Sequence, residues 1–464
     1  AGYGGSASWT QISFMDPYDG DKAGEGGILS FSQDGSRLLI GWPGESWDSC
    51  DDVAVYEWQS GSSTYSLIGD IIPKLGSRVI HSASLSGDGN VVALGVVDST
   101  GSESVWTARV FHYSGGSWQQ VGSNIVGPSS EGSTAKVSIS SDGKVLAVGT
   151  QDASNPSGVN ATKSGRVRIY QWPSNDLAAS DTWTQMGETI EAWKTSEGWY
   201  GSEMEPFSYT VYMDTGTLSG DGTRVVVFRD DNWVGTGYVY EWKSSTWSLV
   251  GDGIYLGGEA SLSNDGTVVA GLFSYIYKES GSGAWSELGS AYSGYEVSLS
   301  SDGTRVASGY AYDNSQAGIV VIQEWDSDAE KWMTMVQIPG ISADDRAGST
   351  VSLSGDGSRV AVYSQGAKHT RVFEIGTTCD TSAAPPNAAV GNCPSTLAFG
   401  SSCQPECIQN STADNPTSTC VSGYLKNATC VNNCEVSAPA NGGMGNCGDF
   451  LADGASCQLE CDPG

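Results

Sequence analysis

The chain has 464 residues, of which 38% are apolar and 62 are glycine, a composition typical of a folded, turn-rich protein rather than a disordered one. Its formal net charge of −31, from 53 acidic residues against 22 Lys and Arg, disfavours binding to nucleic acid or to anionic membranes. It contains no apolar run of about 18 residues, so we expect no membrane insertion.

The first strand signal is Ser-Trp-Thr-Gln-Ile at residues 8–12, which belongs to no hairpin of its own. After it, one hairpin unit occurs in seven copies. In its clearest copy, 351–363, apolar residues alternate with small or polar ones on both sides of a Gly-Asp-Gly turn. Both Asp and Gly tolerate the positive φ that a tight hairpin needs. The turn aspartates are Asp34, Asp88, Asp142, Asp221, Asp265, Asp302 and Asp356.

A second pair of strand signals follows the first six hairpins, as in 238–242 and 247–251 after the fourth turn. Each repeat therefore predicts four short strands, and four-stranded repeats that stack around an axis form a β-propeller. Seven repeats predict seven blades, with the recurrent Trp and Tyr residues packed as apolar area between neighbouring blades.

The longest irregular insertion runs from about 191 to 215 and is rich in aromatic residues. Such a loop is either a partner-binding surface, a platform for glycans, or a cover that folds back on the propeller. Its candidate binding residues are Trp193, Trp199, Tyr200, Phe207 and Tyr209.

The seventh repeat has a third strand at 371–375 but no fourth. The missing strand is at the other end of the chain, where Trp9-Thr-Gln-Ile matches Trp183-Thr-Gln-Met of the third repeat. We therefore predict that residues 8–14 form the outer strand of the last blade and close the ring.

The segment 345–362, which begins Asp-Arg-Ala-Gly-Ser-Thr, and Asp-Lys-Ala-Gly at 21–24 resemble the FG-GAP-type repeat of integrin-alpha-like propellers. The resemblance covers roughly residues 8–376 and extends to extracellular repeat proteins of stramenopile protists. It implies calcium loops in the second hairpins, because calcium takes six or more oxygen ligands. The matching loops at Asp98, Asp152, Asp230 and Asp313 lack the full ligand set, so we expect polar turns there and no cofactor.

Ten of the 11 cysteines lie between Cys379 and Cys461, which is typical of disulfides formed in an oxidising compartment. Three sequons, at Asn160, Asn410 and Asn427, predict N-linked glycans and agree with secretion to the cell surface. Zinc is the less favoured alternative for the cysteines, because they contain no Cys-x-x-Cys and all three histidines precede them.

The cysteine block is a tandem repeat, because Gly391–Cys407 aligns with Gly445–Cys461 and the gaps agree. The module is similar to a sushi (complement-control) domain, and the second copy is truncated, so we expect the natural protein to continue. Six cysteines allow 15 connectivities from sequence alone. The sushi pattern implies Cys379–Cys420 and Cys407–Cys430, which leaves Cys393–Cys403 and, in the second copy, Cys447–Cys457.

Cys50 is the one cysteine of the propeller region, in a polar segment, 47–52, that we expect to be an exposed loop. It is either a buried free thiol or one half of a disulfide to the tail or to another subunit. The expected domains are 1–376, a seven-bladed β-propeller, 377–432, a six-cysteine sushi-like module, and 433–464, a second module. The fold class is all-β.

The sequence gives little support for catalysis, because the three histidines lie in different repeats and no nucleophile elbow or phosphate loop occurs. We expect an extracellular structural protein, a subunit of a cell-surface filament, coat or flagellar hair (mastigoneme). Its expected partners are copies of itself or other structural glycoproteins. The alternative is an adhesion propeller of the lectin or integrin kind that binds glycan or protein.

Overall fold

The computed structural model describes residues 9–15, 27–43, 50–73, 78–98, 105–128, 135–151, 163–173, 177, 181–193, 212–231, 234–258, 260–292, 294–375, 378–398, 401–408, 411–421, 424–438, 440–447, 450–451 and 456–461. The chain divides into two compact units, Gln11–Glu374 and Ile375–Gly464 with Ala1–Thr10. The predicted boundary at 376/377 lies beside this division, and the one at 432/433 remains a prediction. None of the described helices is long and apolar enough to span a membrane.

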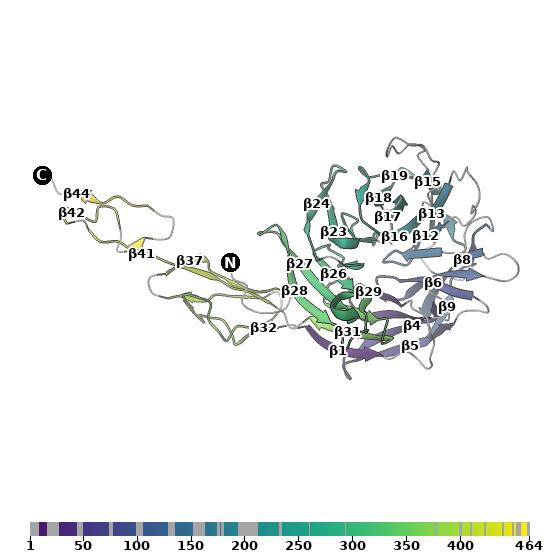
Figure 1. Cartoon of the computed structure of the whole chain (residues 1–464), viewed down its shortest axis with the longest axis horizontal. Coiled ribbons are helices and arrows are strands. Elements are labelled where there is room, and N and C mark those ends of the chain that lie inside the picture. The colour runs from purple at the N-terminus through teal and green to yellow at the C-terminus, as the bar shows by residue number, and fades with distance from the viewer. Residues whose placement is uncertain are drawn as a thin grey trace. The chain divides into compact units, whose positions relative to one another are not determined.

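The strands of the first unit form the seven predicted blades, which Figure 1 shows in chain order from purple to green. Blade 1 consists of β2 (Ile28–Phe31), β3 (Arg37–Pro43), β4 (Cys50–Gln59) and β5 (Thr64–Pro73). Blade 2 consists of β6 (Arg78–Leu85), β7 (Val91–Asp98), β8 (Val105–Ser114) and β9 (Ser117–Gln120). Blade 3 consists of β11 (Ala135–Ile139), β12 (Val145–Gln151), β13 (Lys163–Gln171) and β14 (Thr184–Gln185).

Blades 4 to 6 repeat this order, with a 3₁₀ turn, η1 (Leu272–Ser274), in blade 5 and a one-turn helix, α1 (Asp313–Gln316), in blade 6. Blade 4 consists of β16 (Tyr212–Leu218), β17 (Arg224–Asp231), β18 (Val234–Lys243) and β19 (Thr246–Leu249). Blade 5 consists of β21 (Ala260–Leu262), β22 (Val268–Gly271), β23 (Tyr275–Glu279) and β24 (Trp285–Ser290). Blade 6 consists of β25 (Glu296–Leu299), β26 (Arg305–Tyr310), β27 (Ile319–Asp326) and β28 (Lys331–Pro339). Blades 2, 3 and 4 also carry the short strands β10 (Ile125–Val126), β15 (Ile190–Trp193) and β20 (Ile254–Tyr255).

Blade 7 contains β29 (Ala347–Leu353), β30 (Arg359–Ser364) and β31 (His369–Ile375), and its fourth strand is β1 (Trp9–Met15) from the start of the chain. Figure 1 shows β1, in purple, beside green β31. Ile12 and Met15 pack against Val372 in the same apolar cluster, and the Phe14 ring stacks on His369 at 4.7 Å. The predicted closure of the ring by residues 8–14 is confirmed.

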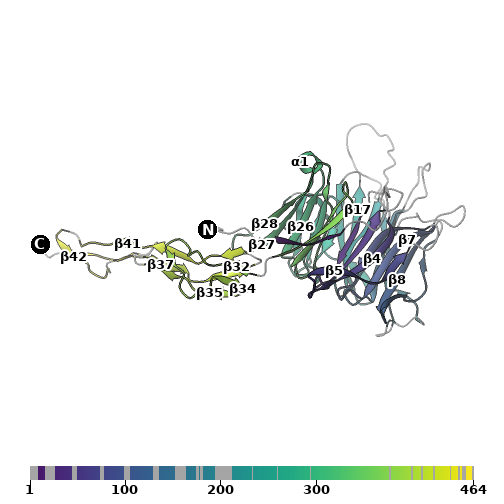
Figure 2. The same ribbon diagram turned by 90° about the horizontal axis from the view of Figure 1, so that it is seen from below.

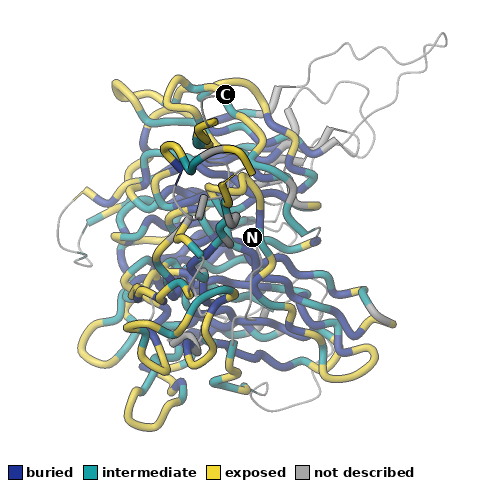
Figure 3. The backbone as a smooth tube through the Cα atoms, turned by 90° about the vertical axis from the view of Figure 1, so that its left-hand side faces the viewer, coloured by how far each residue is buried: buried dark blue, intermediate teal, exposed yellow. Residues whose placement is uncertain are grey.

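The innermost strands β2, β6, β11, β16, β21, β25 and β29 contact one another in a complete ring. Apolar clusters fill the spaces between blades; one of them joins Leu39 and Val53 of blade 1 to Val92 and Leu94 of blade 2. Figure 3 shows the strands largely buried and the turns exposed. Each fully buried Val, Leu or Ile side chain contributes about 2 kcal/mol, so this burial is the main stabilising term of the propeller.

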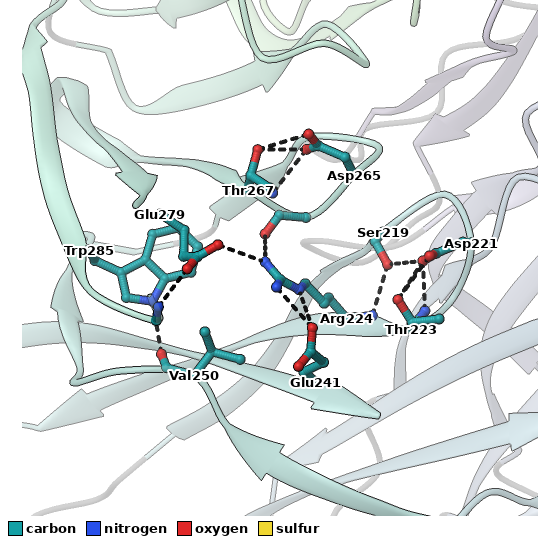
Figure 4. Close-up of polar contacts among 12 residues, drawn as sticks. Ser219, Asp221, Thr223, Arg224, Glu241, Val250, Asp265, Thr267, Glu279 and Trp285 are labelled. Atoms are coloured by element: carbon teal, nitrogen blue, oxygen red, sulfur yellow. Dashed lines mark hydrogen bonds and ion pairs between the residues drawn. The ribbon is translucent and has the colours of Figure 1, made fainter. Parts of the chain in front are cut away.

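Each Ser-x-Asp-Gly turn is held by its own aspartate, and Figure 4 shows the copies at Asp221 and Asp265. In all seven turns the Ser hydroxyl donates to the Asp carboxylate at 2.6–2.8 Å, and so does the backbone N–H two residues after the Asp, at 2.9–3.0 Å. The glycine has φ between 65° and 72°. The aspartates do not share this positive φ, and each contributes its carboxylate as a hydrogen-bond acceptor.

Two rings of hydrogen bonds connect each blade to the next, all the way round. The residue between Ser and Asp links neighbouring turns by backbone hydrogen bonds of 2.7–3.0 Å, and the seam from blade 7 to blade 1 is closed by the Asp356 N–H donating to the Gln33 carbonyl. In the second ring, a Ser or Thr on each inner strand accepts from the inner strand of the following blade at 2.6–3.2 Å. A Cβ at Gly220 would overlap the Asn264 side chain, so the first ring requires a glycine at this one position.

Arginine and tryptophan side chains add bonds between blades. Arg37, Arg224, Arg305 and Arg359 each pair with a glutamate of their own blade and donate to the turn glycine carbonyl of the next blade. Figure 4 shows the Arg224 contacts. The outer-strand tryptophans Trp118, Trp183, Trp247, Trp285 and Trp332 donate to a carbonyl of the preceding blade. The predicted packing of aromatic residues between blades is confirmed, and it includes these hydrogen bonds.

Residues 50–52 lie in a strand, which corrects the expectation of a loop for this part of 47–52, whereas 47–49 lie outside the described residues. Cys50 is the first residue of β4, and its backbone pairs with Ile80 of β6, which joins the sheets of blades 1 and 2. The Cys50 backbone pairs with both β3 and β6, and this pairing draws the end of the polar segment into the sheet. The Cys50 side chain lies outside the described part of the structure, so both interpretations of its thiol remain predictions.

The second unit consists of short strands, β32 (Thr378–Asp380), β33 (Ala388–Ala389), β34 (Thr396–Ala398), β35 (Ser402–Cys403), β36 (Glu406–Cys407), β37 (Ser411–Asn415), β38 (Ser418–Val421), β39 (Tyr424–Lys426), β40 (Thr429–Asn432), β41 (Cys434–Glu435), β42 (Gly442–Gly443), β43 (Phe450–Leu451) and β44 (Glu460–Cys461). The tandem repeat is visible in its hydrogen bonds. Asn392 accepts from the Gln404 N–H, and Asn446 accepts from the Gln458 N–H, both at 2.6 Å.

Candidate functional site

The predicted partner-binding loop lies almost entirely outside the described residues. Strand β15 ends at Trp193, whose backbone is described, and β16 begins at Tyr212. Trp199, Tyr200, Phe207 and Tyr209 lie between these strands, and their role remains a prediction.

The predicted calcium loops give no described metal site. Asp98 ends β7, Asp230 lies in β17 and Asp313 begins α1, whereas Asp152 lies outside the described residues. No group of three His, Cys, Asp or Glu side chains that could hold a metal ion occurs among the described residues.

The connections that leave the second strand of each blade lie at the opposite end from the Ser-x-Asp-Gly turns, because successive strands are antiparallel. Strand β26 starts beside the Asp302 turn and ends at Tyr310. Figure 2 shows α1 beyond the ends of β26 and β27. At this end an aromatic cluster gathers from three separate connections. It consists of Phe273, Tyr295, Tyr310 and Tyr312.

Tyr295 is the centre of the aromatic cluster. Its ring stacks on Tyr310 at 5.0 Å between centroids and makes edge contacts with Phe273 at 5.4 Å and Tyr312 at 6.3 Å. Phe273, Tyr295 and Tyr312 nevertheless remain 43%, 42% and 57% exposed. The rings therefore support one another without being covered by the described part of the protein.

Backbone hydrogen bonds fix the aromatic cluster to the blades. The Phe273 N–H donates to the Gly294 carbonyl at 2.9 Å, and the Tyr295 N–H donates to the Gly309 carbonyl at 2.8 Å. A hydrogen bond to Tyr295, together with the neighbouring charge on that residue, raises the pKa of Tyr310. The Tyr310 hydroxyl therefore remains protonated and able to donate at neutral pH.

Arg346 forms the polar edge of the cluster. Its guanidinium lies 5.6 Å from the centre of the Tyr312 ring and donates to the side chains of Gln316 and Gln365. Its backbone N–H also donates to the Gln316 carbonyl at 2.9 Å. These contacts orient an arginine over an exposed tyrosine face, a favourable cation–π geometry.

A buried ionic group supports the loop that carries Arg346. Asp345 is 1% exposed and accepts from the Ile341 N–H at 2.8 Å, with His369 at 3.8 Å and Arg371 at 4.0 Å. Burial lowers the pKa of Arg371, and the Asp345 charge opposes this shift. The group is enclosed, so its role in the described structure is to hold the 340–346 loop to blade 7.

Three disulfides of the cysteine-rich unit lie wholly within its described residues. They are Cys393–Cys403, Cys407–Cys430 and Cys447–Cys457, the same pairs that the sequence analysis expected. Cys420 is also disulfide-bonded, whereas the side chain of its predicted partner Cys379 is outside the described residues. Cys461 is a free, exposed thiol. The disulfides fit an oxidising, secreted or extracellular environment.

Of the three sequons, only Asn427 lies in the described structure. It is half-buried, between β39 and β40, and its Oδ1 is buried without a hydrogen-bond partner among the described residues. Asn160 and Asn410 lie outside the described residues, so glycosylation remains a prediction at all three positions.

Comparison with known proteins gives similarity of fold and nothing finer. No protein-family model matches the chain, and no curated protein matches it. Among solved structures it is similar to the Myceliophteria thermophila Cps50 (Swd1) β-propeller domain, with a TM-score of 0.48, 10% identity, and coverage of 78% of this chain and 100% of that one. It is also similar to U3-55K, with a TM-score of 0.48, 11% identity, and coverage of 80% and 100%.

A third structure is a putative 6-phosphogluconolactonase from Bacteroides fragilis, with a TM-score of 0.44, 14% identity, and coverage of 69% and 84%. At these identities the likeness concerns the propeller fold only, so the site has to be argued from its own residues.

The sequence analysis missed the aromatic cluster. Its members are spread over residues 273–312 and come from three connections, and the analysis assigned the recurrent tyrosines to packing between blades. The one usable signal was Tyr310-Ala-Tyr312, where strand β26 ends. Tyr310 is the last residue of the strand, after five buried residues, and Tyr312 lies beyond it.

Proposed function

We propose that this protein is a non-enzymatic extracellular scaffold, a subunit of a surface filament, coat or flagellar hair (mastigoneme). The observation that carries the proposal is the pair of hydrogen-bond rings that join all seven blades and close without a weak seam. Such a disc resists local opening, because every blade is bonded to both neighbours through backbone groups.

The disulfides of the second unit support the same proposal. Small modules have too little core to be stable alone, and cross-links make them durable outside the cell. The resemblance of the two regions to FG-GAP-type propellers and sushi modules agrees with a secreted building block. Its partners would be further copies of the chain or other structural glycoproteins.

The test is the assembly state of the secreted, glycosylated protein. We expect purified protein to form ordered polymers in electron micrographs, and native extracellular material to contain the propeller at regular spacing. A protein that stays monomeric by light scattering at all concentrations, and is absent from isolated surface filaments, would contradict the scaffold role.

A second candidate is an adhesion propeller that binds protein or glycan. The exposed aromatic cluster favours it, because rings left in water at the end of a rigid blade commonly mark an interaction surface. The two candidates separate experimentally: a scaffold polymerises with the cluster mutated, whereas an adhesion protein remains monomeric and loses its ligand.

A further inference from the structure

We propose that the aromatic cluster is a binding site for a neutral oligosaccharide chain. The inference goes beyond the scaffold role and does not depend on polymer formation. It also places the site on blades 5 and 6 rather than on the 191–215 insertion.

The first step in the argument is that the cluster is one continuous aromatic surface. Tyr295 contacts the three other rings, and three of the four rings are more than two-fifths exposed. Flat aromatic faces stack on the C–H faces of sugar rings, while tyrosine hydroxyls donate hydrogen bonds to sugar oxygens. Tyr295, Tyr310 and Tyr312 each provide both a ring and a hydroxyl.

The second step is that the site is rigid before any ligand binds. Phe273 has a φ of 58°, and Ser315, Gln316, Asp344 and Arg346 of the same end of the blades also have positive φ. Non-glycine residues in this region cost energy and are concentrated at ligand-binding and active sites. Because the rings are already ordered, a ligand loses less of its binding energy to fixing them.

The third step is the charge around the rings, which disfavours an anionic ligand. Asp313 contributes to the raised pKa of both Tyr292 and Tyr310, so its negative field reaches the cluster. The chain as a whole carries −31. Nucleic acids and sulfated polysaccharides, which also bind aromatic or extracellular surfaces, are repelled. Arg346 and Gln316 supply donors at the edge for sugar hydroxyls.

The experiment titrates the full-length protein with neutral hexasaccharides of β-1,3-glucan, β-1,4-glucan and α-mannan by calorimetry. We expect one of these probes to bind. Tyr312→Ala and Tyr295→Ala should weaken binding at least about tenfold, and Tyr312→Phe, which keeps the ring, should weaken it less. The matched control is Leu249→Ala, an exposed apolar residue, 47% accessible, on outer strand β19, and it should leave affinity unchanged.

Footprinting of the unmodified protein gives an independent readout if a variant fails to fold. With the bound sugar, Tyr295 and Tyr312 should be protected from hydroxyl radicals. The proposal is overturned if none of the three probes binds, or if binding survives the double alanine variant. It is also overturned if a proline-rich peptide protects these rings and the sugars do not. None of these results bears on whether the protein forms filaments.

Discussion

The two units of this chain are stabilised by opposite means. The propeller buries fully enclosed Val, Leu and Ile side chains between all its described blades and adds backbone hydrogen bonds from each blade to the next. The cysteine-rich unit has one described apolar cluster, Leu397, Cys403, Cys420 and Leu425, in which half of the residues are disulfide-bonded cysteines. A large repeat array can rely on burial, whereas a module of about 50 residues depends on covalent cross-links.

The strongest test of this contrast is to break the closure of the propeller. Ile12→Asp places a charge against Val372 and Ala361, and we expect a loss of about 4 kcal/mol of propeller stability. Gln11→Asp introduces the same charge at the exposed neighbouring position of β1 and should have little effect. Thermal melts check both variants, and equal melting temperatures would show that β1 does not lock the ring.

Reduction of the disulfides should destabilise the cysteine-rich unit and leave the propeller unchanged. In a phosphine reductant we expect the 378–461 region to lose about 3 kcal/mol per disulfide and to exchange its amides freely, because the unfolded chain is no longer constrained. Hydrogen exchange followed by mass spectrometry should show the blades unchanged. Faster exchange in the blades would mean that the propeller also depends on a cross-link.

A smaller loss of stability is expected when the contact between blades 7 and 1 is broken. Arg359 pairs with Glu374 at 2.7 Å and donates to the Gly35 carbonyl and to the Tyr65 hydroxyl. Arg359→Met should cost about 2 kcal/mol in chemical denaturation, because buried acceptors lose a charged donor. Lys331→Met, at an exposed position on β28, is the control.

Alkaline titration gives a second readout of the same contact. Burial raises the pKa of Tyr65 to about 12, against the lowering effect of Arg359. The stability that comes from keeping this phenol neutral is complete below the unfolded pKa of about 10, and it is lost as the pH rises through about 12. We expect the propeller to weaken in this window, with the change reduced in Tyr65→Phe.

The smallest predicted effect concerns the turn carboxylates. Burial alone would raise the pKa of Asp221, but hydrogen bonds from the Thr223 backbone and the Ser219 hydroxyl lower it overall. This carboxylate therefore stabilises the fold above its unfolded pKa of about 4, and the effect is lost as the pH falls through the lower folded value. Asp221→Asn should cost less than about 1 kcal/mol at neutral pH and nothing in strong acid, with exposed Asp252→Asn as control.

Patterns that repeat were predictable from the sequence, and single loops were not. The Ser-x-Asp-Gly turns and the match between Trp9-Thr-Gln and Trp183-Thr-Gln sufficed for seven blades and their closure, because a repeated signal outweighs local ambiguity. The cysteine spacing, through the resemblance to a sushi module, gave three correct disulfides.

The misses have local physical causes. The role of the turn aspartates could not be read from their tolerance of positive φ, because they keep ordinary backbone angles and act through their carboxylates. Cys50 joined a strand because a neighbouring blade offered a backbone partner that no local pattern encodes. The aromatic cluster depends on three connections meeting in space, which requires the fold itself.

The ring of Ser and Thr hydroxyls has a consequence for how such a chain can be cut and rejoined. The Phe31 N–H donates to Ser352 of blade 7 just as the inner strand of every other blade donates to the blade before it, so no blade is intrinsically first. A gene that opened at another boundary between blades, with its old ends fused, would encode the same disc.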